Sequence, residues 1–277
     1  MFDKKRLELL KKQAKEVRKD IIRMSLQARS AHMGGALSCV EILTSLYFEI
    51  MNVYPKDPYN DKRDRLIFSK AHDAKALYAV LAERGFFSKV FLEGYEANDG
   101  KLPGHSTRHC VSGVEVSAGS LGHGLSMAVG MAYVGKLDNK EHRVFAVLSD
   151  GECDEGSTWE AIMFAGHHKI DNLIVIVDYN KLQGFGYTRN VLNLEPFSQK
   201  WKSFGWEAVE VDGHNFNALI EVLRKVPIKK NKPTVIIAHT IKGMGGVPIY
   251  VNKVESQYKP PTEKEAKDAI SKLEDKK

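Results

Sequence analysis

Residues 144–184 read VFAVLSDGECDEGSTWEAIMFAGHHKIDNLIVIVDYNKLQG, and this stretch decides the fold. Two apolar runs rich in β-branched residues, Arg143–Ser149 and Leu173–Asp178, each end in polar residues, and a segment with a helical period separates them. We therefore expect a strand, a helix and a second strand parallel to the first. Because the carboxyl ends of parallel neighbours meet at one edge of a sheet, Asp150 and Asn180 are predicted to lie close together.

Three more runs, Arg65–Ser69, Ala208–Val211 and Thr234–Ala238, have the same character, and helical periods separate most of the runs. This alternation predicts an α/β fold in which a parallel sheet is flanked by helices on both faces. Ligands of such sheets bind beyond the carboxyl ends of the strands. Polar segments stand at those positions, among them SKAH with His72 and HTIK with Lys242.

The segments outside the expected sheet are more polar. Apolar residues recur every three to four positions near the start and predict an N-terminal helix within residues 1–30, and a second helix is expected from about Cys39 to Met51. Residues 96–126 are rich in glycine and weakly periodic, which favours a binding loop. The polar tail 250–277 is predicted to be a surface helix or a frayed end. Residues 1–277 are expected to form a single domain.

Composition narrows the classes of function. The formal charge of +6 is not accompanied by any nucleic-acid-binding motif, so a nucleic-acid partner is not expected. The sequence has no run of eighteen apolar residues and no apolar segment near its start, which predicts neither a membrane span nor a signal peptide and favours the cytoplasm. Three scattered cysteines are too few for a disulfide framework or a zinc site, and buried thiols are expected.

The predicted strand tips carry oxygen ligands. The Asp150 carboxylate and the Asn180 amide suit Mg²⁺ better than zinc or copper, and Mg²⁺ readily shares its coordination sphere with phosphate oxygens. Gly151 allows a diphosphate to approach the backbone, and a helix beginning near Glu155 is expected to direct its amide groups at the same anion. An isolated Asp-Gly pair is more often a plain strand-to-helix turn, so the matched position of Asn180 is essential to this interpretation.

Five segments then identify a resemblance. They are SAHMGGALSCVEILTSLYF (30–48), RDRLIFSKAHDAKALYAVLAERGFF (63–87), LPGHSTRHCVSGVEVSAGSLGHGLSMAVGMA (102–132), LSDGECDEGSTWEA (148–161) and HTIKGMGG (239–246). In this order they resemble the N-terminal portion of transketolase, specifically the split form in which the two halves are separate subunits. The resemblance extends from about Gln13 to Lys259 and implies the thiamine-diphosphate-binding fold. Ser149 replaces the first glycine of the family's Gly-Asp-Gly motif.

The resemblance implies a role for each matching residue. It makes Asp150, Asn180 and the carbonyl of Leu182 the ligands of Mg²⁺, or of Ca²⁺. It makes His72, Lys242 and the backbone of Gly151 the contacts of the diphosphate, and it places Gly119, Ser120 and Leu121 beside the rings of the cofactor. His32 and His105 match the histidines that bind sugar hydroxyls and assist proton transfer, and Glu155 matches an acidic residue at the subunit contact near the cofactor.

Three departures from the family pattern concern the substrate more than the cofactor. Ser106 and Thr107 follow His105, where the family usually has a proline and an acidic residue. The family's LGQG is LGHG here, which puts His123 beside the cofactor loop. A family histidine falls near Ser256 or Gln257 and is missing. One hypothesis is that His123 partly replaces this imidazole.

The resemblance also implies a partner. The family's glutamate that activates the cofactor, and the arginines that hold the sugar phosphate, belong to a pyrimidine-binding domain that follows the region matched here. A second subunit is expected to supply that domain, in a heterotetramer with two copies of each chain. The complex would transfer a two-carbon ketol unit from a ketose phosphate to an aldose phosphate, as in the pentose phosphate pathway.

Alternative functions remain open. The altered residues near the substrate suit a relative that acts on a different ketose in a specialised sugar pathway. A non-catalytic scaffold subunit is a third hypothesis, although the metal-binding residues are present. A deoxyxylulose-phosphate synthase or an oxo-acid dehydrogenase subunit fits the segments less well. A dinucleotide-binding domain fits poorly, because SKAH and not a G-x-G-x-x-G loop follows the first strand.

Overall fold

Five strands form one parallel sheet in the computed structural model, which describes residues 3–275. In spatial order they are β1 (Arg65–Phe68), β2 (Val144–Ser149), β3 (Leu173–Tyr179), β7 (Thr234–His239) and β6 (Glu207–Asp212). Each pairs in parallel with its neighbour. All five predicted strands are confirmed, with ends that differ from the predicted ones by about one residue.

The central strands are buried on both faces, which explains their nearly continuous apolar sequences. Every residue of β2 and of β3 is buried. Phe145 and Val147 of β2 contribute to one hydrophobic core, whereas Val144, Ala146 and Leu148 contribute to the other. Successive side chains of a strand point to opposite faces, so the sheet separates two cores.

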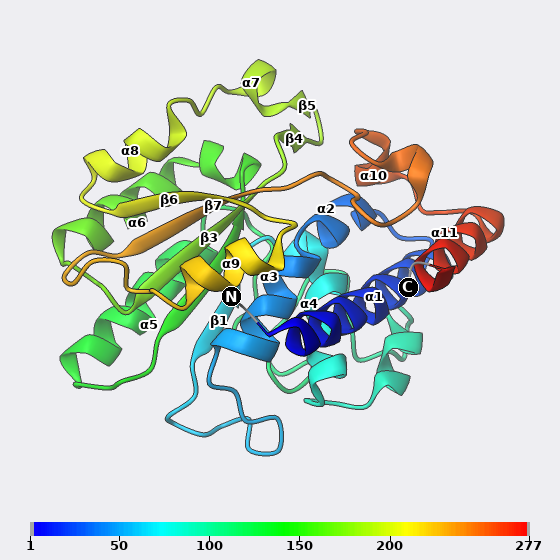
Figure 1. Cartoon of the computed structure of the whole chain (residues 1–277), viewed down its shortest axis with the longest axis horizontal. Helices are drawn as coiled ribbons and strands as arrows, with labels where there is room; N and C mark the ends of the chain where they lie inside the picture. The colour runs from blue at the N-terminus through cyan, green and yellow to red at the C-terminus, as the bar shows by residue number, and fades with distance from the viewer. Residues whose placement is uncertain (1–2, 276–277) are drawn as a thin grey trace.

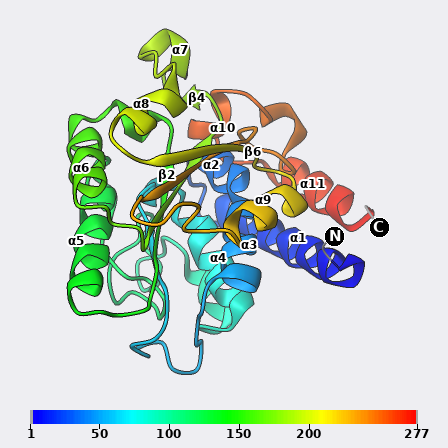
Figure 2. The same cartoon turned by 60° about the vertical axis from the view of Figure 1, so that its left-hand side comes forward.

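Helices cover both faces, as predicted (Figures 1 and 2). On one face lie α1 (Lys4–Gln27), α2 (Met33–Ser38), α3 (Val40–Ser45), α4 (Ala74–Arg84) and α9 (Phe216–Leu223). On the other lie α5 (Gly124–Leu137), α6 (Gly156–His167) and α8 (Phe197–Ser203). Figure 2 shows α5 and α6 side by side, with the sheet between them and α1. None of the described helices is both long enough and apolar enough to cross a membrane.

The predicted second helix begins earlier than expected and is interrupted. Helix α2 starts at Met33 and α3 ends at Ser45, and the π-helix η1 (Leu46–Ile50) continues from there. The sequence MGG argues against a helix start, since glycine is a poor helix former. Tertiary packing overrides this preference, because a Cβ on Gly35 would stand only 2.3 Å from the Asp73 carboxylate.

Short elements complete the chain. They are η2 (Ala71–Asp73), η3 (Lys89–Gly94), η4 (Gly151–Asp154), β4 (Leu182–Gln183), β5 (Gly186–Tyr187), α7 (Thr188–Val191), η5 (Pro248–Tyr250), α10 (Glu255–Tyr258) and α11 (Glu263–Asp275). Residues 96–123 contain no helix or strand, in agreement with the predicted loop. The predicted surface helix of the tail is α11, which packs on α1 and buries Ala266 and Ala269. The tail is not frayed over the described residues, and α10 contributes to the site described below.

Candidate active site

A cavity of about 380 Å³ lies beyond the carboxyl ends of β1, β2, β3 and β7. Its walls include most of the residues predicted for the site, namely His32, His72, His105, Gly119, Leu121, Asp150, Gly151, Asn180, Leu182 and Lys242. Residues that the sequence analysis had not assigned complete it, among them Lys70, Asp73, Gln183, Phe185, Gln257 and Tyr258. The prediction that Asp150 and Asn180 come together at one edge of the sheet is confirmed. A second cavity, of about 330 Å³, contains none of the predicted residues.

Asp150 is a buried carboxylate that has no basic side chain as an ion-pair partner among the described residues. Its Oδ1 accepts a hydrogen bond from the Gly151 amide at 2.8 Å, and its Oδ2 accepts one from the Lys181 amide at 2.5 Å. Burial, with a smaller effect of nearby Asp178, raises the pKa of Asp150 to about 6. The carboxylate is therefore held in place by backbone amides, and Lys242 acts on it only from beyond ion-pair distance.

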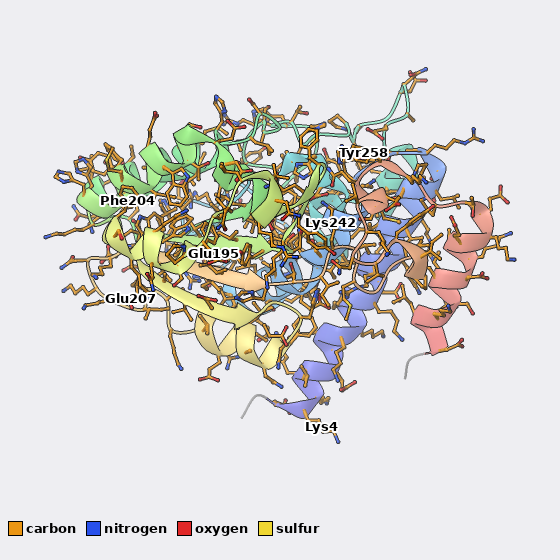
Figure 3. The ribbon with its side chains drawn as sticks, turned by 90° about the horizontal axis from the view of Figure 1, so that it is seen from above. Lys4, Glu195, Phe204, Glu207, Lys242 and Tyr258 are labelled. Carbon is orange, nitrogen blue, oxygen red and sulfur yellow. The ribbon has the colours of Figure 1, made fainter. Side chains whose placement is uncertain are left out.

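Two more oxygen donors lie on the turn that follows β3. The Asn180 side chain is buried, and its Oδ1 accepts a hydrogen bond from the Leu182 amide at 3.1 Å. The Leu182 carbonyl accepts a hydrogen bond from the Lys242 ammonium group at 2.9 Å, so a cation already contacts this oxygen. Burial lowers the pKa of Lys242. Figure 3 shows Lys242 near the middle of the molecule, whereas Lys4 stands at the end of α1.

These donors fit a magnesium–diphosphate group. Across residues 3–275 there is no cluster of three or more His, Cys, Asp or Glu side chains able to hold a metal, which argues against a site built from protein side chains alone. Mg²⁺ is commonly held by one or two carboxylates together with substrate phosphates. One uncompensated carboxylate, an amide oxygen and a carbonyl that already attracts an ammonium group are such a partial set, and Lys242 is placed to balance the charge of phosphate.

A buried charge network adjoins these residues and was not predicted, and two of its members, Lys70 and Asp73, also line the cavity. Lys70, at the end of β1, is fully buried and hydrogen-bonds to Asp178 of β3, and its Nζ lies 3.0 Å from Asp73 Oδ2. Burial acts to lower the pKa of Lys70, but Asp178 and Asp73 outweigh this effect and raise it. Ser38 and Thr240 donate hydrogen bonds to the same Asp178 carboxylate. The network joins α2, β3 and the segments that follow β1 and β7, and it forms part of the cavity wall.

Three imidazoles gather on one wall of the cavity. The ring centroids of His32 and His72 are 5.2 Å apart, and those of His32 and His105 are 6.3 Å apart. Burial lowers the pKa of His72 to about 4, although Asp73 acts in the opposite direction, and burial also lowers the pKa of His32. Both rings are therefore neutral near pH 7, and each can act as a hydrogen-bond donor or acceptor. This gathering was predicted only through the family resemblance.

Three predicted residues do not reach the cavity wall. Ser120, His123 and Glu155 are exposed and none of them lines the cavity. His123 precedes α5, and its Nδ1 lies 3.2 Å from the Leu121 carbonyl oxygen. The hypothesis that His123 partly replaces a missing imidazole stays a prediction, since within this chain His123 lies outside the cavity. Glu155 precedes α6 on the surface, where its expected contact with another subunit is untested.

The predicted role of the α6 N-terminus is not supported. The short 3-10 helix η4 separates Asp150 from α6, and no α6 residue lines the cavity. The neighbouring Glu152, which had not been predicted, is fully buried and accepts hydrogen bonds from Ser69 and, at 2.9 Å, from the Gly122 amide. Through these hydrogen bonds, Glu152 connects the ends of β1 and β2 to the loop that contains Leu121.

The C-terminal segment closes one side of the cavity. Gln257 of α10 hydrogen-bonds to His32 through both backbone and side chain, and the Tyr258 hydroxyl donates to the Gly184 carbonyl at 2.8 Å. Figures 1 and 2 show α10 beside α2. In the sequence, Gln257 lies near the position of the missing family histidine. The contact between Gln257 and His32 joins residues 225 positions apart, and no local sequence pattern predicts it.

Comparisons with known proteins agree with this geometry. Residues 10–274 match the family described as "Transketolase, thiamine diphosphate binding domain". The chain is 40% identical over 267 residues to an apulose-4-phosphate transketolase subunit from Actinobacillus succinogenes, covering 96% of each chain. It is 38% identical over 265 residues to 6-deoxy-6-sulfo-D-fructose transketolase subunit SqwG of Clostridium sp. (strain MSTE9), again covering 96% of each.

Solved structures show the same fold. A crystal structure of transketolase from Campylobacter jejuni superimposes with a TM-score of 0.90 at 30% identity and covers 96% of this chain. The match covers only 43% of that transketolase, so this chain spans about two fifths of the solved enzyme. The subunits from Actinobacillus succinogenes and Clostridium sp. are, by contrast, matched over nearly their whole length.

Proposed function

Because this chain belongs to the transketolase family, as a thiamine-diphosphate-binding subunit of the split form, we propose that it binds thiamine diphosphate through a divalent cation and transfers two-carbon ketol units together with a second subunit. The observation that supports this most directly is the Asp150 carboxylate, which is buried without a basic partner among the described residues, beside Asn180 and the Leu182 carbonyl. We also propose that residues 1–277 act as one domain in this role.

Different cavity residues would bind the metal ion and the diphosphate of the cofactor. Asp150, Asn180 and the Leu182 carbonyl would hold Mg²⁺ or Ca²⁺, while Lys242 and His72 would contact the diphosphate. Burial keeps His72 neutral, so it would donate one N–H hydrogen bond to a phosphate oxygen without adding charge. When bound, thiamine diphosphate supplies a carbon nucleophile that stabilises the two-carbon fragment, which no protein side chain can do.

His32 and His105 would act on the sugar. Both line the cavity, and imidazole groups are suited to exchanging protons with hydroxyl groups near neutral pH. Gly119 and Leu121 would border the cofactor rings within the cavity. Ser120 would contribute through its backbone, and exposed Glu155 and His123 would face the second subunit.

The substrate is proposed to be a ketose of a specialised pathway. The two subunits compared above are named for unusual ketoses, and each of those names includes an anionic group, phosphate or sulfo. Gln257 gives this site a neutral amide beside His32, close to the position, near Ser256 or Gln257, where the family pattern has an imidazole. These observations argue against the pentose phosphate pathway as the setting. Transfer between a common ketose phosphate and an aldose phosphate is the second candidate.

The partner is proposed to carry the pyrimidine-binding domain. Two relatives are named as subunits, and the match to a solved transketolase leaves more than half of that enzyme uncovered. We propose a heterotetramer with two copies of each chain. Within the described residues, the cavity also offers no arginine for the anionic end of a sugar, and the partner would supply it.

The decisive experiment is co-expression with a candidate second subunit, followed by assay of ketol transfer with and without thiamine diphosphate. Donors should include xylulose 5-phosphate, apulose 4-phosphate and 6-deoxy-6-sulfofructose. We expect transfer that depends on cofactor and metal, fastest with one of the unusual ketoses, and complete loss on Asp150→Ala. Full activity of Asp150→Ala, with its metal dependence retained, would refute the metal assignment. No transfer from any ketose would refute the enzymatic function.

A further inference from the structure

Gln257 and His32 form a two-point contact that no local sequence signal predicts. The His32 amide donates a hydrogen bond to the Gln257 carbonyl at 2.8 Å, and the Gln257 side-chain amide lies 2.7 Å from His32 Nδ1. No described residue hydrogen-bonds to the other ring nitrogen, Nε2, and the ring lines the cavity. His32 is therefore fixed through one nitrogen and offers the other to a ligand.

The backbone around this contact allows α2 and α10 to approach each other closely. His32 has a left-handed conformation, with φ of 64°, at the start of α2. A Cβ on Gly34 would stand 2.1 Å from Ser256 Oγ, so only glycine lets α10 lie this close to α2. Ser256 is fully buried, and its hydroxyl donates to the Lys253 carbonyl at 2.7 Å. The position of Gln257 is thus determined by packing.

We propose that Gln257 is a positioning residue that determines which ring nitrogen of His32 carries the proton, so that Nε2 acts as a hydrogen-bond donor or as a base. This inference rests on the proposed function, in which His32 faces a sugar hydroxyl. The inference follows from the chemistry of the amide group, which has both a hydrogen-bond donor and an acceptor. When the amide nitrogen faces Nδ1, the proton of the neutral ring is on Nε2; when the amide oxygen faces Nδ1, the proton is on Nδ1 and the Nε2 lone pair is free.

Rotation of the amide has a low cost at this position. In the arrangement observed, Gln257 Oε1 is buried and has no hydrogen-bond partner among the described residues. Exchanging Oε1 and Nε2 therefore breaks only the bond to His32, which forms again with the opposite polarity. A carboxylate would only accept from Nδ1–H and an ammonium group would only donate, whereas an amide, like a hydroxyl group, supports both tautomers.

The environment of the ring favours the neutral forms. Lys75, His105 and Lys242 all disfavour a positive charge on His32, as does its burial, whereas Asp73 favours the charge. With Oε1 facing Nδ1–H, His32 Nε2 would take the proton from a donor hydroxyl that becomes a carbonyl, forming an imidazolium that Oε1 stabilises. The same nitrogen would then return this proton to the acceptor's carbonyl oxygen as it becomes a hydroxyl. The protein ends each cycle in its starting state.

The test is ¹⁵N NMR of histidine-labelled full-length chain, with the His32 signals identified by comparison with His32→Asn. In Gln257→Glu the carboxylate should fix the proton on Nδ1 and raise the pKa of His32 by about one pH unit or more. In the nearly isosteric Gln257→Met, Nδ1 should lose its hydrogen bond. The matched control is Tyr258→Phe, which removes the adjacent bond to Gly184 and should leave both signals unchanged.

Two outcomes would overturn the inference. One is a Gln257→Glu chain whose His32 keeps its wild-type tautomer and pKa, and the other is a Tyr258→Phe chain that changes them as much as Gln257→Glu does. Neither measurement requires the second subunit or cofactor, so failure of the proposed function would be seen separately, as absence of ketol transfer. In the complete enzyme, Gln257→Glu should move the acidic limb of the kcat/KM profile toward higher pH, and Gln257→Met should lower kcat more than it changes KM.

Discussion

Asp150 and Asp178 stand at the tips of neighbouring strands and are both buried, yet their surroundings are opposite. Asp178 contacts the Lys70 ammonium group and two hydroxyl groups. Asp150 contacts backbone amides and the Thr188 hydroxyl, and no described basic side chain forms an ion pair with it. A buried carboxylate is stable only with a compensating charge or when it is protonated. The comparison indicates that the fold neutralises Asp178 itself, whereas no described side chain forms an ion pair with Asp150; under the proposed function, a bound cation would supply the missing charge.

The largest effect is expected from Asp178→Asn. This change leaves Lys70 buried with only Asp73 as a charged partner, and removing one member of a buried ion pair costs about 3–5 kcal/mol. Urea denaturation should show this loss with or without metal and cofactor. Asp150→Asn should show no comparable loss at pH 7. If the two variants are destabilised equally, the contrast between a structural and a ligand-binding aspartate is wrong.

The next-largest effect is expected in the pH dependence of the unfolding free energy of the chain without metal. The pKa of Asp150 is about 6 in the folded chain and near 3.9 when unfolded, so the folded state holds its proton more tightly. The resulting stability is fully present below about pH 4 and is lost as the pH rises through about 6, amounting to about 3 kcal/mol. The difference in unfolding free energy between wild type and Asp150→Asn should therefore decrease from pH 4 to pH 7. A constant difference would contradict the raised pKa.

Metal and cofactor should reverse that destabilisation. Ligand at 100 times its dissociation constant stabilises a folded protein by about 2.7 kcal/mol. Mg²⁺ together with thiamine diphosphate should therefore raise the melting temperature of the wild-type chain, paired with its partner, by a few degrees. Asp150→Asn should show little or no rise. Equal rises in the two proteins would mean that the cation binds elsewhere.

Most of the fold could be predicted from the sequence because it depends on local patterns. Apolar runs such as Leu173–Asp178 show buried strands, and the polar residues after them lie at the sheet edge by geometry alone. That Asp150 and Asn180 come together follows from the same rule. The start of α2 at Met33 could not be predicted, since its glycines are favoured by contact with Asp73 and Ser256 from distant segments.

The rest of the site depends on contacts between distant segments. Lys70 reads as one polar residue among several after β1, and only the structure shows it buried between Asp178 and Asp73. Gln257 lies in a tail that reads as a surface helix or a frayed end. The role of His123 remains a prediction: proximity in sequence to the cofactor loop does not by itself place its side chain in the cavity of this chain.

The smallest effect concerns the two hydroxyl groups that contact the two aspartates. Thr188 Oγ1 lies 3.4 Å from Asp150 Oδ2, a long hydrogen bond whose loss should cost at most about 1 kcal/mol. Thr188→Val should weaken Mg²⁺ binding in the presence of thiamine diphosphate by up to about fivefold, as measured by calorimetric titration, because it alters the support of a metal ligand. Thr240→Val removes the hydroxyl that donates to Asp178 and should instead lower the unfolding free energy while leaving Mg²⁺ affinity unchanged. If Thr240→Val weakens Mg²⁺ binding as much as Thr188→Val does, the two carboxylates are coupled and do not divide structural and ligand-binding roles between them.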